Sequence, residues 1–152
     1  MGVRAVSRSS AQRYAHANRF RFRCRERHAT RARYSAYGPR VTRWIRVASI
    51  ADLAPGTVTR IGREVTGASD DIALVRDTDG SVHALDDTCT HFVASLSRGR
   101  VEDGCLVCPA HGAQFLLNSG AETTARWLPP LRVHRVEVRG AEVYLEVDDI
   151  TV

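Results

Sequence analysis

Between residues 41 and 147, short apolar runs alternate with turn-forming residues, a pattern that is typical of β-strands. The alternation of apolar and polar residues is clearest at 132–138 and 142–147, on either side of Arg139-Gly140. Asp79-Gly80 is a strong hairpin signal between two further runs. Strands are therefore predicted at 44–47, 56–60, 71–76, 82–85, 105–107, 114–117, 132–138 and 142–147, with one helical turn at 50–53.

These elements predict one all-β domain over residues 41–152, with a smaller lobe inserted between the strands at 82–85 and 132–138. A domain of about this size can bury roughly 60 to 70% of its unfolded surface, which is enough for a core without disulfides. The few cysteines do not have the pattern of a secreted disulfide framework. We therefore expect a reducing, cytoplasmic location.

Two short motifs carry the candidate chemistry: the C-x-H pair Cys89-Thr90-His91 and the C-x-x-H pair Cys108-Pro109-Ala110-His111. Each spacing lets one tight loop present both side chains to neighbouring metal atoms, and Pro109 and Gly112 favour a turn. Two thiolates and two imidazoles in compact pairs are the ligand set of a Rieske [2Fe-2S] centre. Cys89, His91, Cys108 and His111 are therefore predicted to bind metal.

A Cys₂His₂ zinc site is the main alternative, since Cys105 also forms a C-x-x-C pair with Cys108. The first motif is nevertheless C-x-H, and Cys105 belongs to an apolar run that reads as a strand. A zinc-binding interaction module stays open as a function of another class. Colour separates the two, because a Rieske centre absorbs visible light and a zinc site does not.

The run HALDDTCTHFVASLSRGRVEDGCLVCPAHGAQFLL, from His83 to Leu117, resembles the soluble Rieske-type ferredoxins of bacterial aromatic-ring dioxygenases. The likeness extends over residues 41–147. It implies a Rieske-type antiparallel β-sandwich with a small inserted cluster-binding lobe and one [2Fe-2S] cluster. By this resemblance Cys89 and Cys108 bind one iron, and His91 and His111 bind the other. Phe92 departs from the family pattern, which often has Gly or another small residue at this position.

The resemblance also implies a function, that of a one-electron carrier which is not itself an enzyme. Its expected partners are a flavin-dependent ferredoxin reductase, which supplies electrons, and a terminal ring-hydroxylating oxygenase, which receives them. The small Rieske subunit of an assimilatory nitrite reductase is the alternative within the same fold. A monomer is expected, with no membrane partner and no nucleic acid.

Two positions beside the second motif predict a low reduction potential. Rieske proteins of quinol-oxidising respiratory complexes carry extra cysteines in both ligand loops, and a Ser and a Tyr whose hydroxyls donate hydrogen bonds to the cluster and to a ligating sulfur. In this chain, Ala113 and Phe115 occupy the positions of that Ser and Tyr, and neither side chain can donate a hydrogen bond. Since such donors favour the more negative reduced cluster, their absence predicts a potential low in the Rieske range.

Charge divides the chain into two parts. Residues 1–40 contain eleven Arg and a single acid, Glu26, whereas residues 41–152 contain eleven Arg and sixteen acids, so the net charges are +10 and −5. The first part has no apolar run long enough for a signal sequence or a membrane span. We interpret residues 1–40 as an Arg-rich, disordered extension, arising from an over-extended start with Val41 as the true one. A genuine disordered tail and a polyanion-binding arm are the alternatives.

Several other residues receive simpler interpretations. Asp86, Asp87, Glu102 and Asp103 lie near the ligand motifs, where they either steer a basic partner or form a solvated face. His83 and His134 are expected to be satisfied or solvent-facing strand residues. Trp44 and Trp127 are expected to pack in the core or at its edge.

Overall fold

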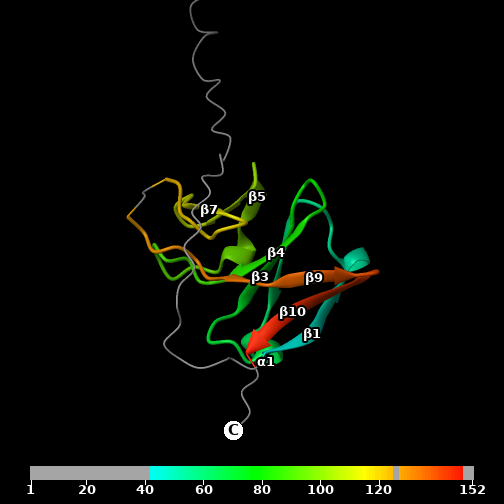
Figure 1. The fold of residues 1–152 in the computed structure, drawn as a ribbon. Helices are drawn as coiled ribbons and strands as arrows, with labels where there is room; N and C mark the ends of the chain where they lie inside the picture. The colour runs from blue at the N-terminus through cyan, green and yellow to red at the C-terminus, as the bar shows by residue number, and fades with distance from the viewer. Residues whose placement is uncertain (1–41, 125–126, 149–152) are drawn as a thin grey trace, which may run out of the picture.

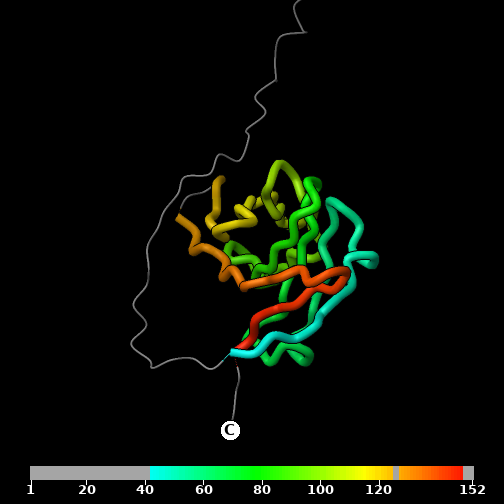
Figure 2. Tube along the Cα trace, turned by 45° about the vertical axis from the view of Figure 1, so that its right-hand side comes forward, coloured from blue at the N-terminus to red at the C-terminus, as the bar shows by residue number. Residues whose placement is uncertain are grey.

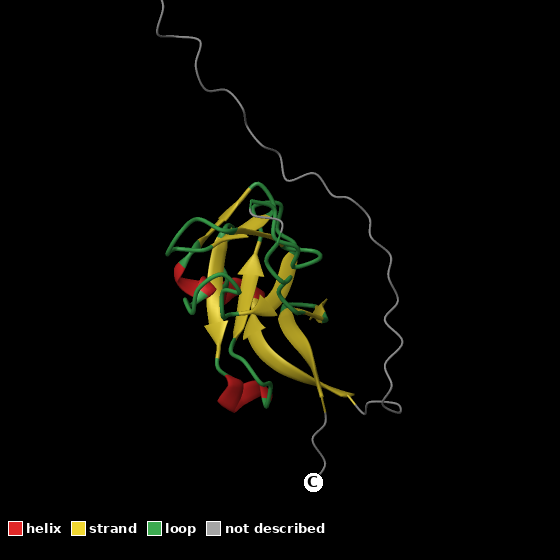
Figure 3. Ribbon diagram, turned by 90° about the vertical axis from the view of Figure 1, so that its left-hand side faces the viewer, coloured by secondary structure: helices red, strands yellow, loops and turns green. Residues whose placement is uncertain are grey.

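The computed structural model describes residues 42–124 and 127–148. Within them the chain forms ten strands and three short helical segments. In chain order these are β1 (Thr42–Ser49), η2 (Ile50–Asp52), β2 (Thr57–Ile61), α1 (Arg63–Thr66), β3 (Ile72–Arg76), β4 (Val82–Asp86), η3 (Leu96–Arg98), β5 (Arg100–Glu102), β6 (Cys105–Val107), β7 (Gln114–Leu116), β8 (Val133–His134), β9 (Val136–Arg139) and β10 (Glu142–Asp148). Strands make up most of the regular structure, as Figure 3 shows. The prediction of an all-β domain is confirmed.

The strands form three antiparallel sheets, with the orders β1-β10-β9, β2-β3-β4-β8 and β5-β6-β7. Figure 1 shows the first sheet at the lower right and the third at the upper left, with β3 and β4 between them. The tube in Figure 2 shows the same three-part arrangement from another side. The third sheet belongs to the inserted lobe, because β5, β6 and β7 all lie between β4 and β8 in the sequence.

Strand β3 explains why the first two sheets and the lobe stay together. Its apolar run Ile72-Ala73-Leu74-Val75 is fully buried. Because successive side chains of a strand point to opposite faces, Ile72 and Leu74 pack in a core with Val143 and Leu145 of β10, whereas Ala73 and Val75 pack in the core of the lobe. A continuous rather than alternating apolar run is what a strand covered on both faces requires.

The prediction of a single strand at 132–138 was wrong, because this segment forms two strands that belong to two different sheets. Val133 and His134 form β8, which pairs with Leu85 and Ala84 of β4. After Arg135, the chain enters β9, which pairs with β10. The alternation of apolar and polar residues continues across the break, so it could not reveal the change of sheet.

Other expectations can be compared directly with the described residues. The predicted helical turn at 50–53 is confirmed as η2. The sequence pattern missed η3, β5 and α1, which are each three or four residues long. Within the described ranges, no helix is long and apolar enough to cross a membrane. The predictions made for residues 1–40 lie outside the part of the chain that the structure describes.

Candidate metal centre

The first ligand motif lies in the loop between β4 and η3, and backbone hydrogen bonds close this loop at its base. The N–H of Cys89 donates to the carbonyl of Ala94 at 2.9 Å, and the N–H of Leu96 donates to the carbonyl of Asp87 at 2.7 Å. An isolated bridge between Thr88 and Ser95 lies between these contacts. His91 follows Cys89 on the outward part of the loop, where its ring is exposed.

The second ligand motif lies in the tight connection between β6 and β7, where Val107 pairs directly with Gln114. The N–H of Cys108 donates to the carbonyl of Ala113 at 2.8 Å, and the N–H of Gly112 donates to the carbonyl of Cys108 at 3.1 Å. Gly112 has a φ of 73°, in the left-handed region that glycine adopts without strain. The glycine that was noted in the sequence therefore closes the turn that carries His111.

The two thiols lie together below the surface. Cys89 and Cys108 are 3% and 1% exposed, and they belong to one buried cluster with Ala113 and Phe115. Burial raises the pKa of the Cys89 thiol, and its hydrogen bond with Cys108 acts in the same direction. The backbone N–H groups of Phe92 and His91 donate towards the Cys89 sulfur and oppose this shift. The same donors would stabilise a thiolate that is bound to iron.

The two imidazoles lie together at the open end of the site. The ring centroids of His91 and His111 are 5.1 Å apart at an interplanar angle of 74°. Phe92 meets the His111 ring at 5.6 Å, and Trp127 meets the His91 ring at 6.3 Å. Both histidines are exposed. The site therefore has a buried sulfur pair and an exposed imidazole pair.

This arrangement fits a cluster of two iron atoms. Across the residues that the structure describes, no three His, Cys, Asp or Glu side chains converge as they would on a single metal ion. The four candidate ligands instead form two pairs, one of thiols and one of imidazoles. A [2Fe-2S] cluster with a His₂ iron takes its protein ligands in this way, two thiolates on one iron and two imidazoles on the other.

The segment after residue 126 packs beside the first ligand loop. The hydroxyl of Thr90 donates to the carbonyl of Pro129 at 2.8 Å. The N–H of Leu131 donates to the carbonyl of Gly120 at 2.9 Å, and Gly120 has a φ of 67°. A Cβ on Gly120 would lie 2.1 Å from the carbonyl oxygen of Leu131, so no larger residue fits. The middle residue of the C-x-H motif thus joins two distant segments, which its spacing alone did not indicate.

Several other sequence interpretations can now be judged. His134 is buried and its Nε2 lies 2.7 Å from Oδ1 of Asp86, and His83 Nε2 lies 2.9 Å from the Ser81 hydroxyl, so both are satisfied strand residues. Trp127 is 74% exposed, so the expectation that it packs in the core or at its edge was wrong. Asp87 is only 3% exposed, which removes it from any steering surface.

Comparison with known proteins agrees with this geometry. The family model described as the Rieske [2Fe-2S] domain matches residues 43–137, and the chain belongs to this family. The chain is 38% identical over 102 residues to "Ferredoxin CarAc" of Metapseudomonas resinovorans, an alignment that covers 67% of this chain and 92% of the relative. The cofactor of the present chain is one [2Fe-2S] cluster, and the chain is an electron-transfer component of a dioxygenase-type system rather than the catalytic enzyme.

Two solved structures place the fold. The ferredoxin in "Complex of reduced oxygenase and oxidized ferredoxin in carbazole 1,9a-dioxygenase" superimposes with a TM-score of 0.61 at 32% identity, over 70% of this chain and 96% of that one. A putative nitrite reductase small subunit from Mycobacterium tuberculosis gives a TM-score of 0.63 at 21% identity, over 72% of this chain and 99% of that one. At this level of identity, the second likeness shows the fold alone.

Proposed function

We propose that this protein carries single electrons from a flavin-dependent ferredoxin reductase to a terminal ring-hydroxylating oxygenase. Cys89 and Cys108 hold one iron of the cluster, and His91 and His111 hold the other. One observation carries the proposal: the two thiols are buried while the two imidazoles are exposed side by side. The bound cluster supplies a centre that accepts and releases one electron.

The protein contributes ligation, burial and access. The buried thiols lie in an apolar cluster, and backbone N–H groups donate towards Cys89. The exposed imidazoles place the histidine iron next to solvent, where a partner can approach it. Electron transfer then requires no opening of the fold, because the histidine edge already lies at the surface.

Exposed apolar side chains adjoin the two histidines: the rings of Phe92 and Trp127 meet those of His111 and His91, and Val93 follows Phe92 in the same loop. We call the set His91, His111, Phe92, Val93 and Trp127 the histidine face. The last three side chains are 61%, 85% and 74% exposed. Exposed apolar groups gathered at one site are typical of protein interaction surfaces. The ferredoxin relative that forms a complex with its oxygenase supports this assignment. We therefore assign partner docking to the histidine face.

The remaining parts of the proposal concern location and assembly. A cytoplasmic location is supported by the likeness to ferredoxin relatives. We propose that the protein acts as a monomer, which leaves the histidine face open to each partner in turn. Two partners that use one face exchange electrons through separate transient encounters.

The experiment that tests this function begins with protein purified without oxygen. Metal analysis is expected to give two iron and two acid-labile sulfide per chain, with the Rieske absorption and electron paramagnetic resonance (EPR) spectra. A flavin-dependent reductase with NADH should then reduce the protein, and an oxygenase of the ring-hydroxylating class should reoxidise it. One equivalent of zinc without sulfide would refute the cluster. Reoxidation by a sirohaem nitrite reductase, but not by the oxygenase, would favour the alternative partner.

A further inference from the structure

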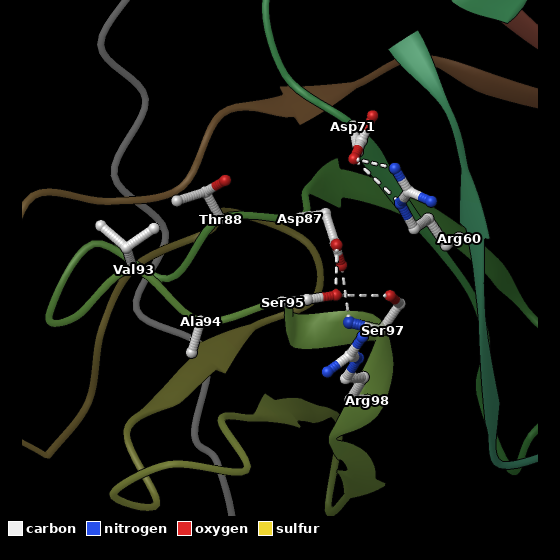
Figure 4. A pocket seen from close by; sticks show the side chains of 9 residues that line it. All are labelled: Arg60, Asp71, Asp87, Thr88, Val93, Ala94, Ser95, Ser97 and Arg98. Carbon is white, nitrogen blue, oxygen red and sulfur yellow. Dashed lines mark hydrogen bonds and ion pairs between the residues drawn. The ribbon is translucent and has the colours of Figure 1, made fainter. Parts of the chain in front are cut away.

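Asp87 is a buried carboxylate two residues before the candidate ligand Cys89. It is 3% exposed. The hydroxyl of Ser95 donates to its Oδ2 at 2.6 Å, and the N–H of Ser97 donates to its Oδ1 at 2.6 Å. Figure 4 shows the carboxylate pointing to these two residues across the loop. Both donors are electrically neutral, so neither of these two contacts is an ion pair.

The same residue also closes the first ligand loop through its backbone. Its carbonyl accepts the N–H of Leu96 at 2.7 Å, and its N–H donates to the carbonyl of Asp71 at 2.8 Å. Asp87 thus bonds to the segment before β3 on one side and to three successive residues after the loop on the other. The ligand loop begins and ends at this point.

The carboxylate also completes the short helix that follows. Ser95 is the N-cap residue of η3, yet its side chain makes no capping hydrogen bond within that helix. The Ser97 N–H, which would otherwise lack a partner at the helix start, bonds to Asp87 instead. An acid near a helix start is also favoured by the local backbone dipoles. The loop is therefore held by a cap supplied from its opposite end.

Two arginines lie near Asp87, and within the described residues neither forms an ion pair with it. It lies at the edge of a cleft of about 580 Å³ that is also lined by Arg60, Asp71 and Arg98. Nε and Nη2 of Arg60 bond to Oδ2 of Asp71 at 2.8 and 2.5 Å, so this arginine is engaged by the neighbouring acid. The Arg98 side chain also lines the cleft, and no ion pair joins it to Asp87. A negative charge is thus held beside the ligand loop.

From these contacts we infer that Asp87 is a positioning residue for the iron ligands. Its carboxylate holds the two ends of the first ligand loop together and thereby sets where Cys89 and His91 stand. Its negative charge, two residues before Cys89, also disfavours the added electron of the reduced cluster. This inference rests on the ligand set of the proposed function. Nothing in the C-x-H spacing indicated it.

The test compares three variants of the intact holoprotein. Asp87→Asn keeps the side-chain shape but removes the charge and disturbs the pair of accepted hydrogen bonds. Ser95→Ala removes one donor and leaves the charge. Asp79→Asn makes the same change of charge at an exposed turn, beyond the end of β3 and β4 that lies away from the ligand loop. The measurements are the reduction potential, the EPR g-tensor of the reduced cluster and the rate of iron release to a chelator.

Asp87→Asn is expected to raise the equilibrium constant for reduction on the order of tenfold, which is about 59 mV for one electron. It should also change the g-tensor and release iron faster. Ser95→Ala should release iron several-fold faster with a much smaller change of potential, because the charge remains. Asp79→Asn should match the wild type in all three measurements.

The inference is overturned if Asp87→Asn matches Asp79→Asn in potential, g-tensor and iron release. If Asp87→Asn does not accumulate with a cluster, Ser95→Ala decides, and a wild-type g-tensor with a wild-type release rate would overturn the inference. Failure of the proposed function looks different, because the wild-type protein itself would then lack a Rieske signal. If the wild-type protein shows the Rieske signal and Asp87→Asn has wild-type properties, this inference is refuted and the proposed function is not.

Discussion

The rings of His91 and His111 meet edge to face, with centroids 5.1 Å apart, although they stand on loops that follow different strands. The first loop is closed by the Cys89–Ala94 hydrogen bond and the second by the Cys108–Ala113 hydrogen bond. Each loop therefore places one thiol inward and one imidazole outward. The two loops together supply both halves of the proposed ligand set.

Exchange of one imidazole for a thiolate tests this pairing. In His91→Cys the Rieske absorption and EPR spectra are expected to disappear. Any cluster that remains should have a potential lower by about 250 mV or more, because an anionic ligand replaces a neutral one. Cys108→Ser should also lose the spectrum. His83→Cys is the matched control, since His83 lies on β4 and contacts Ser81. A Rieske spectrum that persists in His91→Cys would contradict the ligand assignment.

Residues Ala113 and Phe115 offer a way to raise the potential. Both side chains are buried in the same part of the hydrophobic core as the two thiols, and neither can donate a hydrogen bond. Ala113→Ser and Phe115→Tyr each add a hydroxyl whose hydrogen bond favours the more negative reduced cluster. If that bond strengthens by about 1 to 2 kcal/mol on reduction, the potential rises by roughly 40 to 90 mV.

Protein-film voltammetry measures this change of potential, with cluster content checked by absorption. Ala141→Ser is the control, because Ala141 lies at the exposed turn between β9 and β10. The double variant should shift further without strict additivity, since both donors act on one charge distribution. Unchanged or lower potentials in both single variants would show that solvent exposure or loop packing sets the value instead.

The histidine face predicts which apolar residues matter for electron transfer. Trp127→Ala is expected to lower the second-order rate constant for reduction of the oxygenase about tenfold, because exposed aromatic residues at interfaces often dominate binding. Val93→Ala should lower it by a smaller factor. Stopped-flow absorption measures both rates, and an unchanged reduction potential shows that the cluster is intact.

The chain provides a matched control for this experiment. Val65 of α1 is 53% exposed and lies outside the histidine face, so Val65→Ala makes the same change as Val93→Ala at another surface. The control should transfer electrons at the wild-type rate. Equal rates for Trp127→Ala, Val93→Ala and the control would place partner docking elsewhere.

The charge break at residue 40 predicts that the basic segment is dispensable. A shortened chain beginning at Val41 should fold, assemble the cluster and accept electrons at an unchanged rate. The comparison uses iron content, thermal midpoint and reductase-dependent reduction of both lengths of chain. Loss of cluster assembly or of partner reduction in the shorter chain would refute the interpretation of residues 1–40 as an extension without a role.

The candidate ligands could be predicted from the sequence because their chemistry is local. A thiolate and an imidazole two or three residues apart can be recognised without knowing the fold. The same holds for β3, whose unbroken apolar run indicates burial on both faces. Strand pairing around Asp79-Gly80 is equally local, since a hairpin joins neighbours in the chain.

Other features depended on contacts between distant segments. Apolar and polar residues alternate in both parts of the segment 132–138. Only the pairing of the first part with β4 and of the second part with β10 divides this segment into β8 and β9. Trp127 was expected to be packed, yet it stands exposed at His91, because burial depends on what surrounds a residue.

The sequence by itself determined the candidate donor atoms of the metal site and most of the strands around them, because residue type and short spacing express these directly. Only the tertiary structure decided which ligands are buried, which are exposed, and which acid holds the first loop. Asp87 shows the physical reason. In the sequence it is one of two adjacent acids, and its neighbour Asp86 bonds to His134 instead. The burial of Asp87 against Ser95 and Ser97 exists only once the loop folds back on itself.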